Sequence, residues 1–188
     1  MITTRIGKKT DIDGVLALQE KYLYRNLSLA QRKNGFVTTP FSRLQLKQII
    51  EENGMFIAKN QAGEIISYAF AADWKYFEQW EIFNYMVSRF PDLAFNGKEI
   101  STENSFQYGP VCIEESYRGK GILNLIFEEM RLEFVKKYPI SITFINKINL
   151  ISEKAHTKKL GWEIIDEFEF NHNHYIGLAF DMKNSVIK

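Results

Sequence analysis

The first part of the chain alternates between strand-like segments and segments with apolar residues at helical spacing. After a short extended start at residues 3–6, a segment opening at Asp11 has a helical pattern, made by Ile12, Val15, Leu16, Leu18 and Tyr22. Residues 24–40 are irregular, and Ser42 is a good N-cap for a second helix that Gly54 ends. The pattern predicts a strand, a helix, an irregular segment and a second helix.

A hairpin and an aromatic segment follow. Residues 55–59 and 64–73 are strand-like, and the intervening residues 60–63 are typical of a hairpin turn. The segment around residues 74–100 is unusually aromatic, and we interpret it as an insertion whose rings fill the core beneath a helix. The alternative is a wall of a substrate pocket or a dimer face, so a homodimer is possible.

A strand, a loop, a long helix and another strand form the next unit. The strands cover residues 106–113 and 140–146, and the amphipathic helix between them covers residues 121–137. A helix that connects two neighbouring strands in this way makes them parallel. Such a unit can carry a phosphate site where its helix begins.

The last part of the chain predicts a short helix and a second hairpin. The helix covers residues 152–160 and ends at Gly161, and the strands 162–170 and 175–181 are joined by Asn171-His172-Asn173-His174. We find no repeat, linker or low-complexity segment. The whole pattern predicts one α/β domain over residues 1–188.

Composition and net charge limit the classes of partner that the protein is expected to bind. Apolar residues make up 45% of the chain, which is ample for a packed core, and the net charge of +1 is too balanced for a protein that binds nucleic acid or anionic lipid. Cys112, the only cysteine, is expected to be a buried apolar residue. Residues 1–9 have no signal-peptide pattern and the apolar run 65–72 is too short to span a bilayer, so we expect a cytoplasmic protein.

Two glycines separated by one residue stand where the long predicted helix begins. In the loop 118–123, Gly119 and Gly121 let backbone N–H groups approach a ligand closely, and the helix N-terminus favours an anion. Arg118 and Lys120 add positive charge suited to a pyrophosphate. The simpler alternative is a turn eased by glycine, with solvated basic residues. The loop lacks both the P-loop and the Rossmann glycine spacing.

The residues around this loop resemble the GNAT superfamily of acetyl-CoA-dependent N-acetyltransferases. Arg118 and Gly121 match the family's pyrophosphate motif [RQ]xxGx[GA], whereas Leu123 replaces its last small residue. A second set resembles the family's Asn-x-x-[AS] helix and its Leu-Gly-aromatic ending, namely Asn149, Ser152, His156, Leu160, Gly161 and Trp162. The specific motifs lie within residues 111–162, and the order of elements extends the resemblance to most of residues 3–181.

The resemblance implies a fold and a co-substrate. The fold is a mixed, mostly antiparallel sheet flanked by helices and splayed at a central parallel strand pair. Acetyl-CoA would lie in the gap, with its pyrophosphate on the glycine loop and its pantetheine along the open edge of a strand, where alternate N–H groups point the same way. The implied cofactor-binding residues are Val111, Ile113, Arg118, Gly119, Lys120, Gly121, Ile122, Leu123 and Asn149.

The implied reaction is direct attack of a primary amine, on a small molecule or a peptide, on the acetyl thioester. A lysine-like amine with a pKa of about 10.4 is neutral in only about one part in a few thousand at pH 7, so a base or a water relay is needed. Many relatives carry a Glu where this chain has Gln107, which can orient a water but cannot take a proton. Glu103 and Glu114 are the nearby carboxylate candidates, and each is also interpretable as a solvated surface residue.

The family motif points to two different residues as the acid that protonates the leaving thiolate, depending on which end of the motif the positions are counted from. Counting seven residues from Asn149, as the family does, reaches His156, whereas counting back four from Gly161 reaches Thr157. His156 titrates in a suitable range and is the candidate acid, although a structural histidine is equally compatible with the sequence.

Two other classes of function remain open. Gln107, Leu123 and the ambiguous acid are also compatible with an acyl-CoA-binding or partner-binding module without turnover. A nucleotide-binding domain is disfavoured by the glycine spacing. His172 and His174 are too few ligands for a metal site, and we expect a turn there instead.

Overall fold

A seven-stranded sheet, in the order β1-β2-β3-β6-β7-β9-β8, runs through the computed structural model, which describes residues 2–187. Its strands are β1 (Thr3–Ile6), β2 (Met55–Lys59), β3 (Ile65–Ala72), β6 (Ser105–Ile113), β7 (Ile140–Asn146), β8 (Glu163–Phe170) and β9 (Asn173–Asp181). Every neighbouring pair is antiparallel except β6 and β7, which are parallel. The predicted mixed, mostly antiparallel sheet with one parallel pair is confirmed.

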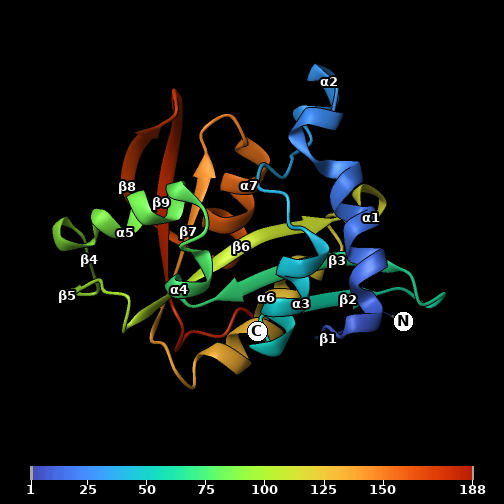
Figure 1. The fold of residues 1–188 in the computed structure, drawn as a ribbon, viewed down its shortest axis with the longest axis horizontal. Coiled ribbons are helices and arrows are strands. Elements are labelled where there is room, and N and C mark those ends of the chain that lie inside the picture. The colour runs from blue at the N-terminus through green and yellow to red at the C-terminus, as the bar shows by residue number, and fades with distance from the viewer. Residues whose placement is uncertain (1, 188) are drawn as a thin grey trace.

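Helices cover both faces of the sheet (Figure 1). One face carries α1 (Ile12–Tyr22), α3 (Arg43–Glu51), α4 (Trp74–Phe77) and α5 (Glu81–Ser88), and the other carries α6 (Ile122–Phe134). The short α7 (Leu150–Lys154) continues directly into a π-helical turn, η5 (Ala155–Leu160). The remaining helices are α2 (Leu29–Arg32) and the 3-10 turns η1 (Lys9–Asp11), η2 (Tyr24–Asn26), η3 (Phe90–Asp92) and η4 (Glu115–Tyr117).

Local sequence signals set several of these boundaries. The Ser42 hydroxyl accepts from the backbone of Gln45 at 3.3 Å, and the Gln45 side chain accepts from the Ser42 backbone at 2.8 Å, so a capping box starts α3 as predicted. The second hairpin differs from the prediction, because β9 begins at Asn173. Only Asn171 and His172 form the turn, with φ values of 46° and 59°, as the tightest hairpin turns require.

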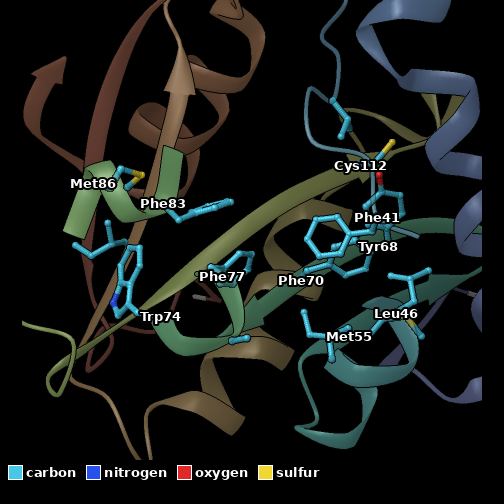
Figure 2. Packing of buried hydrophobic residues seen from close by; sticks show 14 of the residues in the cluster. Phe41, Leu46, Met55, Tyr68, Phe70, Trp74, Phe77, Phe83, Met86 and Cys112 are labelled. Carbon is cyan, nitrogen blue, oxygen red and sulfur yellow. The ribbon is translucent and has the colours of Figure 1, made fainter. Parts of the chain in front are cut away.

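The aromatic insertion contributes residues to the core, and one of them, Phe83, also lines the smaller of the two clefts described below. Trp74, Phe77, Phe83 and Met86 from α4 and α5 are buried and belong to the hydrophobic cluster drawn in Figure 2. The Trp74 indole donates to the Ser105 hydroxyl at 3.0 Å, which ties α4 to the start of β6. The insertion ends in a two-stranded hairpin, β4 (Ala94–Phe95) and β5 (Lys98–Glu99).

The parallel strands β6 and β7 separate along their length. They pair only where residues 105–107 face residues 140–142, after which β6 stays with β3 and β7 stays with β9 (Figure 1). A bulge at Gly109 and Pro110 helps the separation, because β6 uses one more residue than β3 between neighbouring pairs, and Pro110 has no N–H to donate. The sheet therefore forks on the side where the glycine loop follows β6.

Candidate active site

A cleft of about 520 Å³ lies in the fork and reaches the loop before α6. Eight of the nine predicted cofactor residues line it, namely Val111, Ile113, Arg118, Gly119, Gly121, Ile122, Leu123 and Asn149. The ninth, Lys120, does not, and its ammonium lies 5.1 Å from the ring centre of Tyr117. Segments predicted separately from the sequence are thus brought together around one opening.

The loop presents a row of unused backbone donors. Within the described chain, none of the N–H groups of residues 119–124 donates to another residue. Gly119 and Gly121 have φ values of 76° and 79°, and a side chain built on either would meet no atom within 4 Å. Gly121 is the N-cap of the 13-residue α6, so the positive end of the helix dipole adds to these donors. The loop therefore offers an anion free N–H donors and the positive end of a helix dipole.

The open edge of β6 supplies further donors. The Glu114 N–H donates to the Ile66 carbonyl of the neighbouring segment at 2.8 Å, which fixes the direction of alternate N–H groups. By this alternation, the N–H groups of Val111 and Ile113 point away from β3 and into the fork. An extended ligand can pair with this edge as an added strand does.

Arg118 connects two segments that line the cleft. Its Nε donates to the Ile113 carbonyl at 2.9 Å, a second nitrogen donates to the Asn34 carbonyl, and the guanidinium lies 4.9 Å from the ring centre of Tyr22. We expected Arg118 to supply charge to the loop, and the structure adds a positioning role. It links the end of β6 to the segment before residue 36.

Asn149 has a similar linking role on the other wall. Its Oδ1 caps α7 by accepting from the Ser152 N–H at 3.3 Å, and its Nδ2 donates to the Phe36 carbonyl at 3.1 Å. The side chain is buried. Both halves of the amide are therefore engaged within the protein, although the residue lines the cleft.

The π-helical turn η5 decides which of the two counted residues, His156 or Thr157, faces the cleft. A π-turn accommodates one extra residue in a helix, which is the extra residue that made the two counts disagree. His156 is 3% exposed and lines the cleft, whereas the Thr157 hydroxyl donates back to the Glu153 carbonyl at 2.9 Å. His156 is the residue that reaches the site.

His156 is held in one tautomer. Its Nδ1 lies 2.8 Å from the Ser152 carbonyl, which only accepts, so Nδ1 carries the proton. Burial lowers the pKa of His156 to about 4, and the bond to Ser152 opposes this only in part. The imidazole is therefore neutral near pH 7, and Nε2, which has no partner among the described residues, presents a lone pair. It must take a proton before it can give one to a thiolate.

The two candidate carboxylates lie outside the cleft. Glu114 is bound by Lys21 at 2.7 Å and by the Tyr22 hydroxyl at 2.8 Å. Burial, which raises its pKa, is outweighed by these two hydrogen bonds, so the pKa of Glu114 is lowered. Glu103 lies in a turn, and the hydrogen bond from Thr102 lowers its pKa. Neither Glu103, which is exposed, nor Glu114, which is half-buried, lines the cleft, so the structure brings neither carboxylate next to His156.

A second, smaller cleft of about 80 Å³ adjoins the first through the fork. The two clefts share a wall made by Phe36, Val37, Val111, Asn149, Ser152 and His156. The smaller one is also lined by Gln107 and Thr143 and by the rings of Phe83 and Phe144. His156 and Val111 thus stand where the two spaces meet.

Comparisons with known proteins match this chain by structure. No family model and no curated protein sequence matches it. An N-acetyltransferase from Staphylococcus aureus Mu50 has a TM-score of 0.63 at 16% identity over 97% of this chain and 99% of that one. A putative acetyltransferase from Salmonella typhimurium, solved with its cofactor acetyl-CoA, has a TM-score of 0.62 at 13% identity over 96% and 94% of the two chains.

A third structure carries the superfamily name. It is a GNAT superfamily phosphinothricin acetyltransferase from Sinorhizobium meliloti in complex with AcCoA, with a TM-score of 0.62 at 18% identity over 96% of this chain and 88% of that one. This chain has the GNAT fold. The resemblance seen in the loop and in residues 149–162 is therefore confirmed at the level of the fold.

Within this GNAT fold, sequence reasoning missed two polar neighbours of His156. The rings of Tyr108 and Trp162 lie 5.7 and 5.8 Å from the imidazole, and the Tyr108 hydroxyl and the Trp162 Nε1 have no partner among the described residues. Tyr108 follows Gln107 in a strand that reads as plain core, so no local signal marked it. Trp162 was noted only as part of a motif.

The described residues were also searched for a metal site and for a membrane-spanning helix. In residues 2–187, no group of three or more His, Cys, Asp or Glu side chains is placed to hold a metal ion. None of the helices in the same range combines the length and the apolar run that a membrane span requires.

Proposed function

We propose that the protein transfers the acetyl group of acetyl-CoA to a primary amine on a small molecule or a peptide. The observation that carries the proposal is the continuous cleft that joins the free amides of residues 119–124, the open edge of β6 and the lone pair of His156. A pyrophosphate, an extended amide chain and a reacting group need these three features in this order.

The cofactor would bind from the loop inwards. The amides of residues 119–124 and the dipole of α6 would hold the pyrophosphate. The Val111 and Ile113 N–H groups would pair with the pantetheine, and that of Val111, at the meeting point of the clefts, would polarise the thioester carbonyl. Leu123 lines the cleft, and its own N–H makes no hydrogen bond to another described residue.

His156 would transfer the proton that the amine loses to the sulfur of the leaving thiolate. The amine nitrogen attacks the thioester carbon, a C–N bond forms, the C–S bond breaks and its electrons leave on sulfur. The amine must lose one proton and the sulfur must gain one. His156 Nε2 would accept the proton from the amine and return it to the thiolate, because Nδ1 is committed to Ser152. His156 would thus be the acid for the thiolate, as expected from the sequence, after it has served as the base for the amine.

Titration and turnover together test the proposal. At one hundred times its dissociation constant, acetyl-CoA should stabilise the fold by about 2.7 kcal/mol, which raises the melting temperature by several degrees. Release of free thiol from acetyl-CoA, measured across a panel of amines, then reports transfer. Turnover with product containing the acetyl group supports the enzyme, and binding without turnover on a broad panel supports a non-catalytic acyl-CoA-binding module instead.

A further inference from the structure

The charges around the two clefts limit which kind of amine can react. The inference drawn from them rests on the proposed function. Among the described residues, no Asp or Glu lines either cleft. The charged residues lining the larger cleft, Arg118 and Lys159, are both cations, and the smaller cleft has no charged residue in its wall. An ammonium ion entering this space would lose its hydration and gain no counter-ion.

The polar groups that face the smaller cleft are neutral. Gln107 is 2% exposed, its Nε2 donates to the Tyr108 carbonyl at 2.7 Å, and its Oε1 has no partner among the described residues. His156 offers an unprotonated Nε2. The Thr143 hydroxyl makes no hydrogen bond to another described residue. These groups can accept an N–H or O–H hydrogen bond, but they cannot compensate a full positive charge.

Aromatic rings form the rest of the wall. Phe83 from the insertion and Phe144 from β7 have ring centres 5.4 Å apart, and Phe36 lies on the shared wall. At about 80 Å³ the space admits only the reacting end of an acceptor. Flat apolar groups pack well against such rings.

We propose that the natural acceptor is a weakly basic amine, such as an aromatic amine or a hydrazide, which enters the smaller cleft uncharged and with a flat apolar group next to its nitrogen. A lysine-like alkylamine is neutral in only about one part in a few thousand at pH 7, and the site has no carboxylate to take its extra proton. A weakly basic amine is already neutral, so only the proton released on C–N bond formation must move, and His156 carries it to the sulfur.

The direct experiment is competition within one molecule. The wild-type protein with acetyl-CoA is given 4-aminobenzylamine, which has one aromatic and one alkyl amine, and the acetylated nitrogen is identified by NMR. The separate compounds aniline and benzylamine are assayed in parallel by thiol release. We expect acetylation at the aromatic nitrogen and a kcat/KM at pH 7 at least tenfold higher for aniline than for benzylamine.

A matched pair of variants tests the charge argument. Thr143→Asp adds a carboxylate to the smaller cleft, and Thr143→Asn has nearly the same shape without the charge. We expect Thr143→Asp to raise the benzylamine-to-aniline ratio of kcat/KM at least tenfold and Thr143→Asn to leave it within about threefold. If either variant fails to fold, the wild-type competition alone decides.

The outcomes separate this inference from the proposed function. Preferred acetylation of the alkyl nitrogen overturns the inference and leaves the acetyltransferase in place. Acetyl-CoA binding without turnover of either class of amine overturns the inference as well. Absence of acetyl-CoA binding overturns the proposed function itself.

Discussion

The Nδ1 atom of His156 lies 2.8 Å from the carbonyl oxygen of Ser152, four residues earlier in the chain. This contact fixes the tautomer of a buried imidazole and leaves Nε2 as an acceptor. It is made inside a segment where α7 gives way to the π-turn that begins at Ala155. The position of the lone pair therefore depends on the single extra residue that this turn accommodates.

The first prediction compares His156 with its neighbour. We expect His156→Phe to lower kcat by about 10²- to 10⁴-fold, the usual range for a proton-transfer group, with the dissociation constant of acetyl-CoA changed less than about threefold. Thr157→Val should keep kcat within about twofold, because the Thr157 hydroxyl bonds back to Glu153. Steady-state kinetics and calorimetric titration measure both; equal losses in the two variants would contradict the register.

The second prediction concerns stability and pH. The pKa of His156 falls from 6.5 to about 4 on burial, so below pH 6.5 the unfolded chain binds a proton that the folded chain does not. The free energy of unfolding should therefore fall as the pH drops from about 6.5 to 4, by on the order of 3 kcal/mol from this group. In His156→Phe, the free energy of unfolding measured with urea should depend less on pH over this range. The same pH dependence in the wild-type and variant proteins would contradict a buried neutral imidazole.

The third prediction concerns the glycine loop. Gly121→Glu places a side chain and a negative charge among the free amides, and we expect acetyl-CoA binding to be lost while the fold is kept. Gly97→Glu is the matched control, because Gly97 also has a positive φ of 72° and open space, in the turn between β4 and β5. Both variants should lose about 1–2 kcal/mol of stability from the left-handed backbone. Equal acetyl-CoA affinity in the two variants would place the pyrophosphate elsewhere.

The fourth prediction separates the two basic residues of the loop. Arg118→Gln removes the bonds to the Ile113 and Asn34 carbonyls, whereas Lys120→Gln removes a side chain that does not line the cleft. A hydrogen bond to a charged group contributes about 1.5–3 kcal/mol, so losing the Arg118 charge beside the proposed pyrophosphate site should lower acetyl-CoA affinity about 10- to 100-fold in Arg118→Gln. Lys120→Gln should change it by less than about threefold. Calorimetric titration of both variants would show the opposite ranking if Lys120 were the residue that meets the phosphate.

Much of the fold was predictable because its signals are local. Alternating and helical spacing located β6, β7 and α6 to within a few residues, and the Ser42 and Gly54 signals bracketed α3. The glycines of the loop were informative because only a ligand-facing or turning backbone favours them. The GNAT resemblance then supplied the fork, which no local pattern encodes.

The candidate site was less predictable because its chemistry depends on tertiary contacts. Glu114 is adjacent in sequence to the cleft residue Ile113, but its ion pair with Lys21 joins residues 93 positions apart. The π-turn that selects His156 over Thr157 has no sequence signature beyond a disagreement in counting. The smaller cleft combines residues of β6, β7 and α5, and of these only Gln107 was singled out in the sequence, through the family resemblance.

The most direct test of the acetyl-CoA site is amide hydrogen exchange at residues 111–124, measured with and without saturating acetyl-CoA. We expect exchange to slow at least tenfold in the amides of residues 119 and 121–124 and at Val111 and Ile113, because these residues line the cleft and their free N–H groups would gain an acceptor. ATP and NAD at the same concentration should protect the loop far less. Protection of the loop by ATP but not by acetyl-CoA, or protection by acetyl-CoA that spares residues 111–124, would contradict an acetyl-CoA site in the fork.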